Sequence, residues 1–377
     1  GMQGNIEKST PAYRECLRLS QAIKDYGMVS VTTMVRAFDL CQYGRLDEAA
    51  MYCQTIIDAG DQRRTFYQAG PSYIGLGGVH LERYELDNAE DYLTRGIDLC
   101  RQSGMDGIYT GTLQMARLLQ AKGDLTAAAA TLHRLEQHLQ RWDFTLVARQ
   151  VSLRMAMGDM DGLLRMVDPL LAILDDRSYA RELPLIAQES FKLSLARIYI
   201  AHDDFEQAGN LLNEVQTTVE AGGRNGRLLE VALLQALMAQ KVGSSQLAIQ
   251  HIERALALGE QAGFVLLFVE EGAALIPLLN AVSRHKVYAH RLLNAFTGDD
   301  ESTAGEAPGL IEPLTPREID VLRLIAIGDS NQTIGDKLFI SVRTVKKHIT
   351  NILGKLHADN RTQAVARARE LDLLSSD

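Results

Sequence analysis

The feature that most constrains the fold of this chain is residues 314–356, which carry start and stop signals for three short helices. The first helix opens with the capping signature Thr-Pro-Arg-Glu at residues 315–318. A helical apolar pattern follows until Gly328, a residue type that commonly ends helices. Ser330 and Ser341 are the expected caps of the next two helices. The stretch therefore predicts three helices joined by short connections.

The connection between the second and third of these helices is very short, because only Phe339 and Ile340 separate them. So short a link between helices with apolar faces is typical of a helix-turn-helix. The exposed face of the third helix is left to cationic and polar side chains, namely Arg343, Lys346, Lys347 and Thr350. Residues 341–358 contain four Lys or Arg, two His and no acid, which suits the major groove of DNA. The alternative is a solvated charged face without a ligand.

These residues resemble a known family. The motifs Leu314-Thr315-Pro316-Arg317-Glu318, Thr344-Val345-Lys346-x-His348 and Asn360-Arg361-Thr362-x-Ala364 are similar to those of the LuxR/FixJ-type DNA-binding domain. The resemblance implies binding to double-stranded DNA as a homodimer, with the third helix in the major groove. It also implies a fourth helix, at about residues 362–373, that serves as a dimer contact.

Helical spacing and this resemblance together assign roles to individual residues. We expect base reading by Lys346, Lys347 and Thr350, and phosphate contacts by Asn331, Ser341, Arg343 and Thr344. We expect the dimer contact from Ala364, Val365 and Ala368, the apolar stripe of the fourth helix.

The chain before about residue 296 contains a degenerate internal repeat, in which a turn is followed by a helix start. Aligned on Leu46, Leu86, Leu125, Met160, Phe205 and Ser245, the copies are spaced 40, 39, 35, 45 and 40 residues apart. This is the period of a two-helix repeat, whose pairs must stack into a solenoid because one pair cannot bury both its faces. An acidic or small residue near each helix start can cap that helix, and a small residue one turn later lets paired helices approach. The sequence therefore predicts an all-α protein, a helical-repeat solenoid followed by a small four-helix module.

The turn signature and helix pairing resemble tetratricopeptide repeats in a longer form. Residues 230–279 look like the end of the repeat domain of MalT-like regulators, just before their LuxR-type module. No segment matches the phosphate-binding motif Gly-x4-Gly-Lys-Ser/Thr, so we expect a MalT-like regulator lacking the ATPase part. The expected domains are a repeat domain at 1–296, a flexible linker at 297–313 and a helix-turn-helix domain at 314–377. The linker is small, acidic and contains Gly and Pro; a fixed surface loop is the alternative.

The charge of the chain is distributed unevenly. The formal net charge is −9, yet residues 310–377 carry 10 Lys or Arg against 9 Asp or Glu, which leaves 29 against 39 for the rest. The acidic part of the chain should be repelled by DNA. The positive charge that is useful for DNA binding is concentrated on one helix, and the net charge of the whole chain is therefore a poor guide to DNA binding. The four cysteines have no paired short spacing and predict neither a disulfide framework nor a metal site. No apolar run is long enough for a membrane span, and we expect a cytoplasmic, nucleoid-associated protein.

The combination predicts a bacterial-type, sequence-specific DNA-binding transcriptional regulator. Its repeat domain would sense a small-molecule effector or a partner protein, and RNA polymerase is a further candidate partner. The alternative is a scaffold or adaptor whose C-terminal module does not read DNA. We expect no enzyme, no catalytic residue, no cofactor and no metal, because no segment passes as a nucleophile, phosphate-binding or metal-ligand motif.

Overall fold

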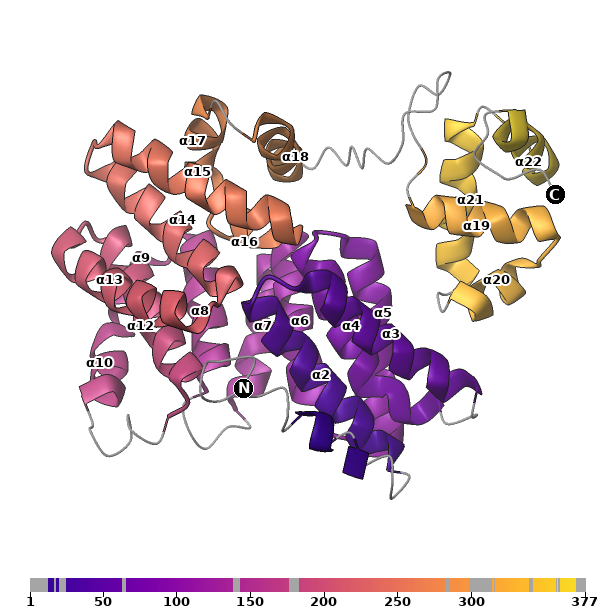
Figure 1. The fold of residues 1–377 in the computed structure, drawn as a ribbon, viewed down its shortest axis with the longest axis horizontal. Coiled ribbons are helices and arrows are strands. Elements are labelled where there is room, and N and C mark those ends of the chain that lie inside the picture. The colour runs from indigo at the N-terminus through magenta and orange to yellow at the C-terminus, as the bar shows by residue number, and fades with distance from the viewer. Residues whose placement is uncertain are drawn as a thin grey trace. The chain divides into compact units, whose positions relative to one another are not determined.

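The computed structural model describes residues 13–16, 18–19, 25–62, 66–137, 143–175, 183–282, 285–297, 314, 316–338, 342–356, 358 and 360–370. These residues form helices and turns and contain no strand, which confirms the predicted all-α class (Figure 1). The chain divides into two compact units, residues 1–298 and 299–377. The predicted linker falls outside the described residues, apart from Thr297 at the end of the last helix of the first unit.

The first unit is a stack of antiparallel helix pairs, as the repeat period predicts. The first helices of the pairs are α2 (Tyr26–Gln42), α4 (Gly70–Glu82), α6 (Ile108–Ala121), α8 (Phe144–Met157), α12 (Leu185–Ala201) and α14 (Asn225–Lys241). The second helices are α3 (Leu46–Gln62), α5 (Leu86–Ser103), α7 (Leu125–Glu136), α13 (Phe205–Gly222) and α15 (Ser245–Ala262). The fourth pair differs, since its second helix is split into α9 (Met160–Leu164) and α10 (Val167–Asp175). A short 3-10 helix, η1 (Phe66–Ala69), precedes α4.

The turn inside each pair has one geometry, which explains why the sequence motif repeats. Its first residue adopts a left-handed conformation in all six copies, at Gly44, Tyr84, Gly123, Gly158, Asp203 and Gly243. The N–H of the next residue then donates to a carbonyl five positions earlier, as Asp124 does to Leu119 at 2.9 Å and Asp204 to Tyr199 at 2.9 Å. This pattern satisfies the last carbonyls of the first helix.

The packing role expected of the motif is confirmed, and the capping role is seen in three copies but not at Glu85 or Ser244. The carboxylates of Asp124, Asp159 and Asp204 accept hydrogen bonds from the backbone N–H groups of residues 127, 162 and 207, at the starts of α7, α9 and α13. The small residues one turn into the second helices are fully enclosed, with at most 1% exposure: Ala49, Ala89, Ala128, Ala208 and Ala248. Because no larger side chain intervenes, the two helices of a pair approach closely.

The first helices form a continuous layer, since α4 contacts α6, α6 contacts α8, α8 contacts α12 and α12 contacts α14. The layer closes on itself, because α14 also contacts α2 (Figure 1). Gly226 makes this contact possible: a Cβ atom built there would lie 2.3 Å from the carbonyl oxygen of Cys41.

The end of the first unit folds back onto the repeats. After α15 come α16 (Leu266–Glu270), the 3-10 helix η2 (Ala273–Leu275), α17 (Ile276–Ala281) and α18 (Lys286–Thr297). Helix α16 contacts both α4 and α6, although these helices lie far earlier in the sequence. The ring of Phe268 meets that of Tyr288 of α18 edge-on, with centroids 5.8 Å apart.

The second unit consists of α19 (Pro316–Ile327), α20 (Asn331–Leu338), α21 (Val342–Lys355) and α22 (Arg361–Glu370). One apolar core joins α19, α20, α21 and α22, and its fully enclosed members include Val321, Ile334, Val345 and Ile352. Across the residues that are described, no helix of either unit is long and apolar enough to cross a membrane.

Candidate nucleic-acid interface

The second unit contains the predicted pair of closely joined helices, α20 and α21. Gly328, with φ of +96°, ends α19, and its N–H donates to the carbonyl of Ile325 at 3.0 Å. The hydroxyl of Ser330 then accepts a hydrogen bond from the N–H of Thr333 at 3.1 Å, so Ser330 caps α20 as predicted. The predicted turn residues Phe339 and Ile340 and the predicted cap Ser341 lie outside the described residues.

One face of α21 is packed into the core of the unit. Val345 and Ile352 have no exposed surface, Leu356 just after the helix is 2% exposed, and Ile349 packs against the same core. His348 is also buried. These four apolar residues recur at helical spacing on one side of α21, so the orientation of the opposite face is fixed.

The opposite face of α21 presents Lys346 and Thr350 to solvent. The two residues are four positions apart and so lie on one side of the helix. The hydroxyl of Thr350 donates to the carbonyl of Lys346 at 3.0 Å. The side chains of the other predicted residues of this helix, Arg343, Thr344 and Lys347, fall outside the described part of the chain. Asn331 is half-buried at the first position of α20.

Sequence reasoning missed one polar residue on this face, Asn351, which is exposed next to Thr350. The signal was available, since Asn351 lies four positions after Lys347 and an amide side chain can pair with adenine. Conversely, Lys355 stabilises the fold and is not part of the exposed face. Its ammonium lies 3.1 Å from the carboxylate of Glu318, which is 2% exposed, and the ion pair ties α21 to α19.

The predicted dimer stripe on α22 lies mostly in the core of its own unit. Ala364 and Ala368 have no exposed surface and belong to the core of their own unit, and Val365 packs against that core. Ala364 and Ala368 thus leave no exposed surface for a second copy, whereas Val365 is partly exposed. The stripe instead holds α22 against α19 and α21, and the guanidinium of Arg361 adds a hydrogen bond to the carbonyl of Asp329 at 2.7 Å. The exposed residues of α22 are Arg361, Thr362, Ala366, Arg367 and Arg369.

The fold and this interface define a class of protein, a tetratricopeptide-like helical-repeat protein that carries a helix-turn-helix module. Comparison with protein families agrees: residues 1–285 match the family described as MalT-like TPR region, and residues 312–368 match the one described as bacterial regulatory proteins, luxR family. The first match spans most of the chain, which therefore belongs to the MalT-like repeat family.

Individual relatives point the same way. The chain is 29% identical to the HTH-type transcriptional regulator MalT of Klebsiella pneumoniae over 315 residues, which cover 73% of this chain and 34% of that protein. It is 23% identical to MalT of Vibrio parahaemolyticus over 316 residues, 76% of this chain and 34% of that protein. The transcriptional regulatory protein LiaR of Bacillus subtilis is 52% identical over 64 residues, 17% of this chain and 30% of that protein. The chain thus spans about a third of the length of these MalT relatives.

Proposed function

We propose that this protein is a sequence-specific DNA-binding transcriptional regulator, and that α21 enters the major groove. The observation that carries the proposal is the exposed face of α21. Lys346 and Thr350 are presented together there, while the other face of the helix is fixed in the core. A fixed helix with a cationic, hydrogen-bonding outer face is what reading base edges requires. The LuxR-type match supports the same role.

Within this proposal, residues divide by the part of DNA that they contact. Lys346, Lys347 and Thr350 would read base edges, and Asn351 joins them because it is exposed and lies four positions after Lys347. Phosphate contacts would come from Asn331 at the start of α20 and, in sequence, from Ser341, Arg343 and Thr344 around the start of α21. Such a role needs no enzymatic activity of this chain. A protein in this role would act in the cytoplasm, at the nucleoid.

Selection from a pool of duplexes with a randomised centre tests the proposal. The full chain is expected to enrich one sequence over successive rounds at fixed salt, because base contacts favour one site over the pool. Salt must be held constant, since phosphate contacts make all affinities fall as salt rises. A pool that stays random after selection would contradict DNA reading and leave the adaptor function as the better account.

A dimer on DNA is the second part of the proposal. A single module buries little surface, so two copies on a two-part site are expected. The surface available for their contact is the outer face of α22, where Thr362, Ala366 and Arg369 are exposed. Sedimentation of the selected duplex with the full chain is expected to give two chains per duplex, and one chain on a single half-site would contradict it.

The repeat unit is proposed to receive the signal, from a small-molecule effector or a partner protein. Helical-repeat stacks present extended inner surfaces that are suited to binding. RNA polymerase is a further proposed partner of the DNA-bound protein, as transcription regulation requires contact with the transcription machinery or competition with it.

A further inference from the structure

The segment between α15 and η2 crosses the layer of first helices of the repeat unit and is called the strap below. It runs from Phe264 to Gly272 and includes α16. Phe264, Leu266 and Phe268 anchor it, with at most 2% exposure each. The N–H of Val265 donates to the carbonyl of Glu82, the last residue of α4, at 2.8 Å. The strap therefore lies against helices more than a hundred residues earlier in the chain.

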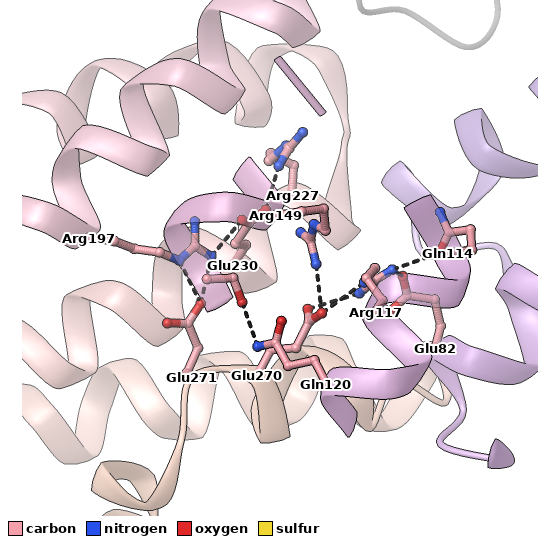
Figure 2. A network of polar contacts seen from close by, with 11 residues as sticks. Glu82, Gln114, Arg117, Gln120, Arg149, Arg197, Arg227, Glu230, Glu270 and Glu271 are labelled. Atoms are coloured by element: carbon pink, nitrogen blue, oxygen red, sulfur yellow. Dashed lines mark hydrogen bonds and ion pairs between the residues drawn. The ribbon is translucent and has the colours of Figure 1, made fainter. Parts of the chain in front are cut away.

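The strap ends in two adjacent carboxylates that meet a row of arginines (Figure 2). Glu270 accepts hydrogen bonds from Nε and Nη2 of Arg117 at 2.8 and 2.9 Å, and from Nη1 of Arg149 at 2.6 Å. Glu271 accepts from Nε and Nη2 of Arg197 at 3.1 and 2.6 Å. The side chains of these five residues are between 4% and 18% exposed. Both carboxylates of the strap are therefore held by guanidinium groups with little exposure to solvent.

The arginines belong to three successive helices of the layer of first helices, α6, α8 and α12. Arg117 also donates to Glu82 at 2.6 Å, and Arg197 to Glu230 of α14 at 2.7 Å. Arg117 and Arg197 are thus held by the wall of the repeat unit, meaning its helices α4 to α14, independently of the strap. Arg149 is not held in this way. Figure 2 shows Arg149 directed to Glu270 from the side opposite the strap backbone.

Without the strap, the side chains that the helices of the repeat unit contribute to this network carry a net positive charge. The residues drawn in Figure 2 from the wall include four arginines, Arg117, Arg149, Arg197 and Arg227, and two glutamates, Glu82 and Glu230. Buried charges are stable only when they are paired, so the wall requires two further negative charges. The strap supplies them. A free ligand with two negative charges would meet the same requirement, because planar guanidinium groups bind carboxylate and phosphate alike.

The two carboxylates of the strap are not held equally. Burial opposes ionisation of both, but the charges of Arg117 and Arg149 outweigh it at Glu270 and lower the pKa of that group to about 2. At Glu271 burial prevails over the single partner Arg197, and the pKa is raised above its ordinary value. Glu271 is therefore the weaker occupant, and the end of the strap near Arg197 is where a competing anion would enter first.

We propose that Arg117, Arg149 and Arg197 form an effector site for a small ligand with two negative charges, and that the strap occupies this site until the ligand displaces Glu270 and Glu271. The ligand class is a phosphate dianion or a short dicarboxylate. The inference rests on the proposed function only in calling the ligand an effector, since the site itself is independent of DNA.

The test is isothermal titration of the full chain with inorganic phosphate, and separately with succinate, at constant ionic strength. In Glu270→Gln/Glu271→Gln the competing charges are gone, so the variant is expected to bind one dianion per chain at least about tenfold more tightly than the unaltered chain. The probe that binds more tightly shows whether the ligand class is a phosphate dianion or a short dicarboxylate. Adding Arg149→Gln to this variant is expected to weaken binding about fivefold or more, because it removes one charged hydrogen bond.

A second variant keeps the test decisive if the double variant does not fold. Glu271→Gln leaves Glu270 in its ion pairs with Arg117 and Arg149, and it too is expected to bind the better probe more tightly than the unaltered chain. The matched control is Glu189→Gln, which removes the buried partner of Arg224 outside this network. The proposal is overturned if the folded variants show no saturable binding, or if Glu189→Gln gains the same binding.

Discussion

Two adjacent glutamates of the strap should respond in different ways to the same substitution. Glu270→Gln and Glu271→Gln each remove one negative charge and keep the shape of the side chain. Glu270 bridges Arg117 and Arg149, whereas Glu271 has hydrogen bonds from Arg197 alone. The two substitutions therefore test whether the arginine row stabilises the strap through Glu270.

The magnitude follows from the pKa of Glu270, which is lowered from an ordinary 4.5 to about 2. Each tenfold change in proton affinity corresponds to about 1.4 kcal/mol, so the folded state favours the charged carboxylate by about 3 kcal/mol. Glu270→Gln should lower the free energy of unfolding by about that amount at pH 7. The pKa of Glu271 is raised by burial, so its charge is a cost in the folded state. Glu271→Gln should change stability by less than about 1 kcal/mol.

The pH dependence follows from the sign of the shift. A carboxyl group with a lowered pKa in the folded state stabilises the protein above its unfolded pKa, and the effect is lost as pH falls through the folded pKa. The difference between the unaltered chain and Glu270→Gln should therefore be full above about pH 5 and shrink between pH 4.5 and 2. At pH 3 it should be about half its neutral value or less.

Urea unfolding followed by circular dichroism at 222 nm measures these values, because the repeat helices dominate the signal and urea does not screen charge. The control is Glu220→Gln, which breaks an exposed ion pair with Arg254 and should cost less than about 1 kcal/mol. Equal losses in Glu270→Gln and Glu271→Gln, or a loss in Glu270→Gln that is the same at pH 3 as at pH 7, would refute the reasoning.

Three further predictions concern packing and capping. Gly226→Ala would place a Cβ 2.3 Å from the carbonyl oxygen of Cys41 and force α14 away from α2. It should lower the free energy of unfolding in urea by about 1–3 kcal/mol. An unchanged urea midpoint would count against this contact. Ser330→Ala removes the cap of α20 and should cost about 1 kcal/mol, seen as faster amide hydrogen exchange in that helix. Ala368→Asp should unfold the second unit, because it buries an unpaired charge, while Ala366→Asp should leave the unit folded and weaken only the dimer on DNA. A folded Ala368→Asp that fails only to dimerise would restore the original assignment of the α22 stripe.

Local features of this fold could be predicted from sequence because short-range physics determines them. The turn residues Gly123 and Asp124 end one helix and start the next within a few positions, so the repeat period is visible in the sequence. The same holds for Gly328 and Ser330 in the second unit. The outer face of α21 followed from the spacing of Val345 and Ile352, because the buried side of a helix determines the exposed side.

Features that depend on long-range contacts could not be predicted. Spacing marks Ala364 and Ala368 as an apolar stripe, but it does not say whether their own unit or a second copy covers them. The pairing of Glu270 with Arg117 joins residues 153 positions apart, and helical spacing gives no reason to connect them. The split between α9 and α10 was also missed, although the fourth copy has Leu163 where the other copies have alanine.

The most direct test of the DNA-reading assignment is discrimination by Lys346→Ala. Fluorescence anisotropy at fixed salt would compare the affinity of the full chain for its selected duplex and for a scrambled duplex. Lys346→Ala should reduce the ratio of the two affinities by about tenfold, which corresponds to about 1.4 kcal/mol of lost base contact. The charge-matched control is Lys286→Ala, at an exposed position on α18, and it should leave the ratio unchanged. An unaltered ratio in Lys346→Ala would contradict the assignment of α21 as the helix that reads DNA.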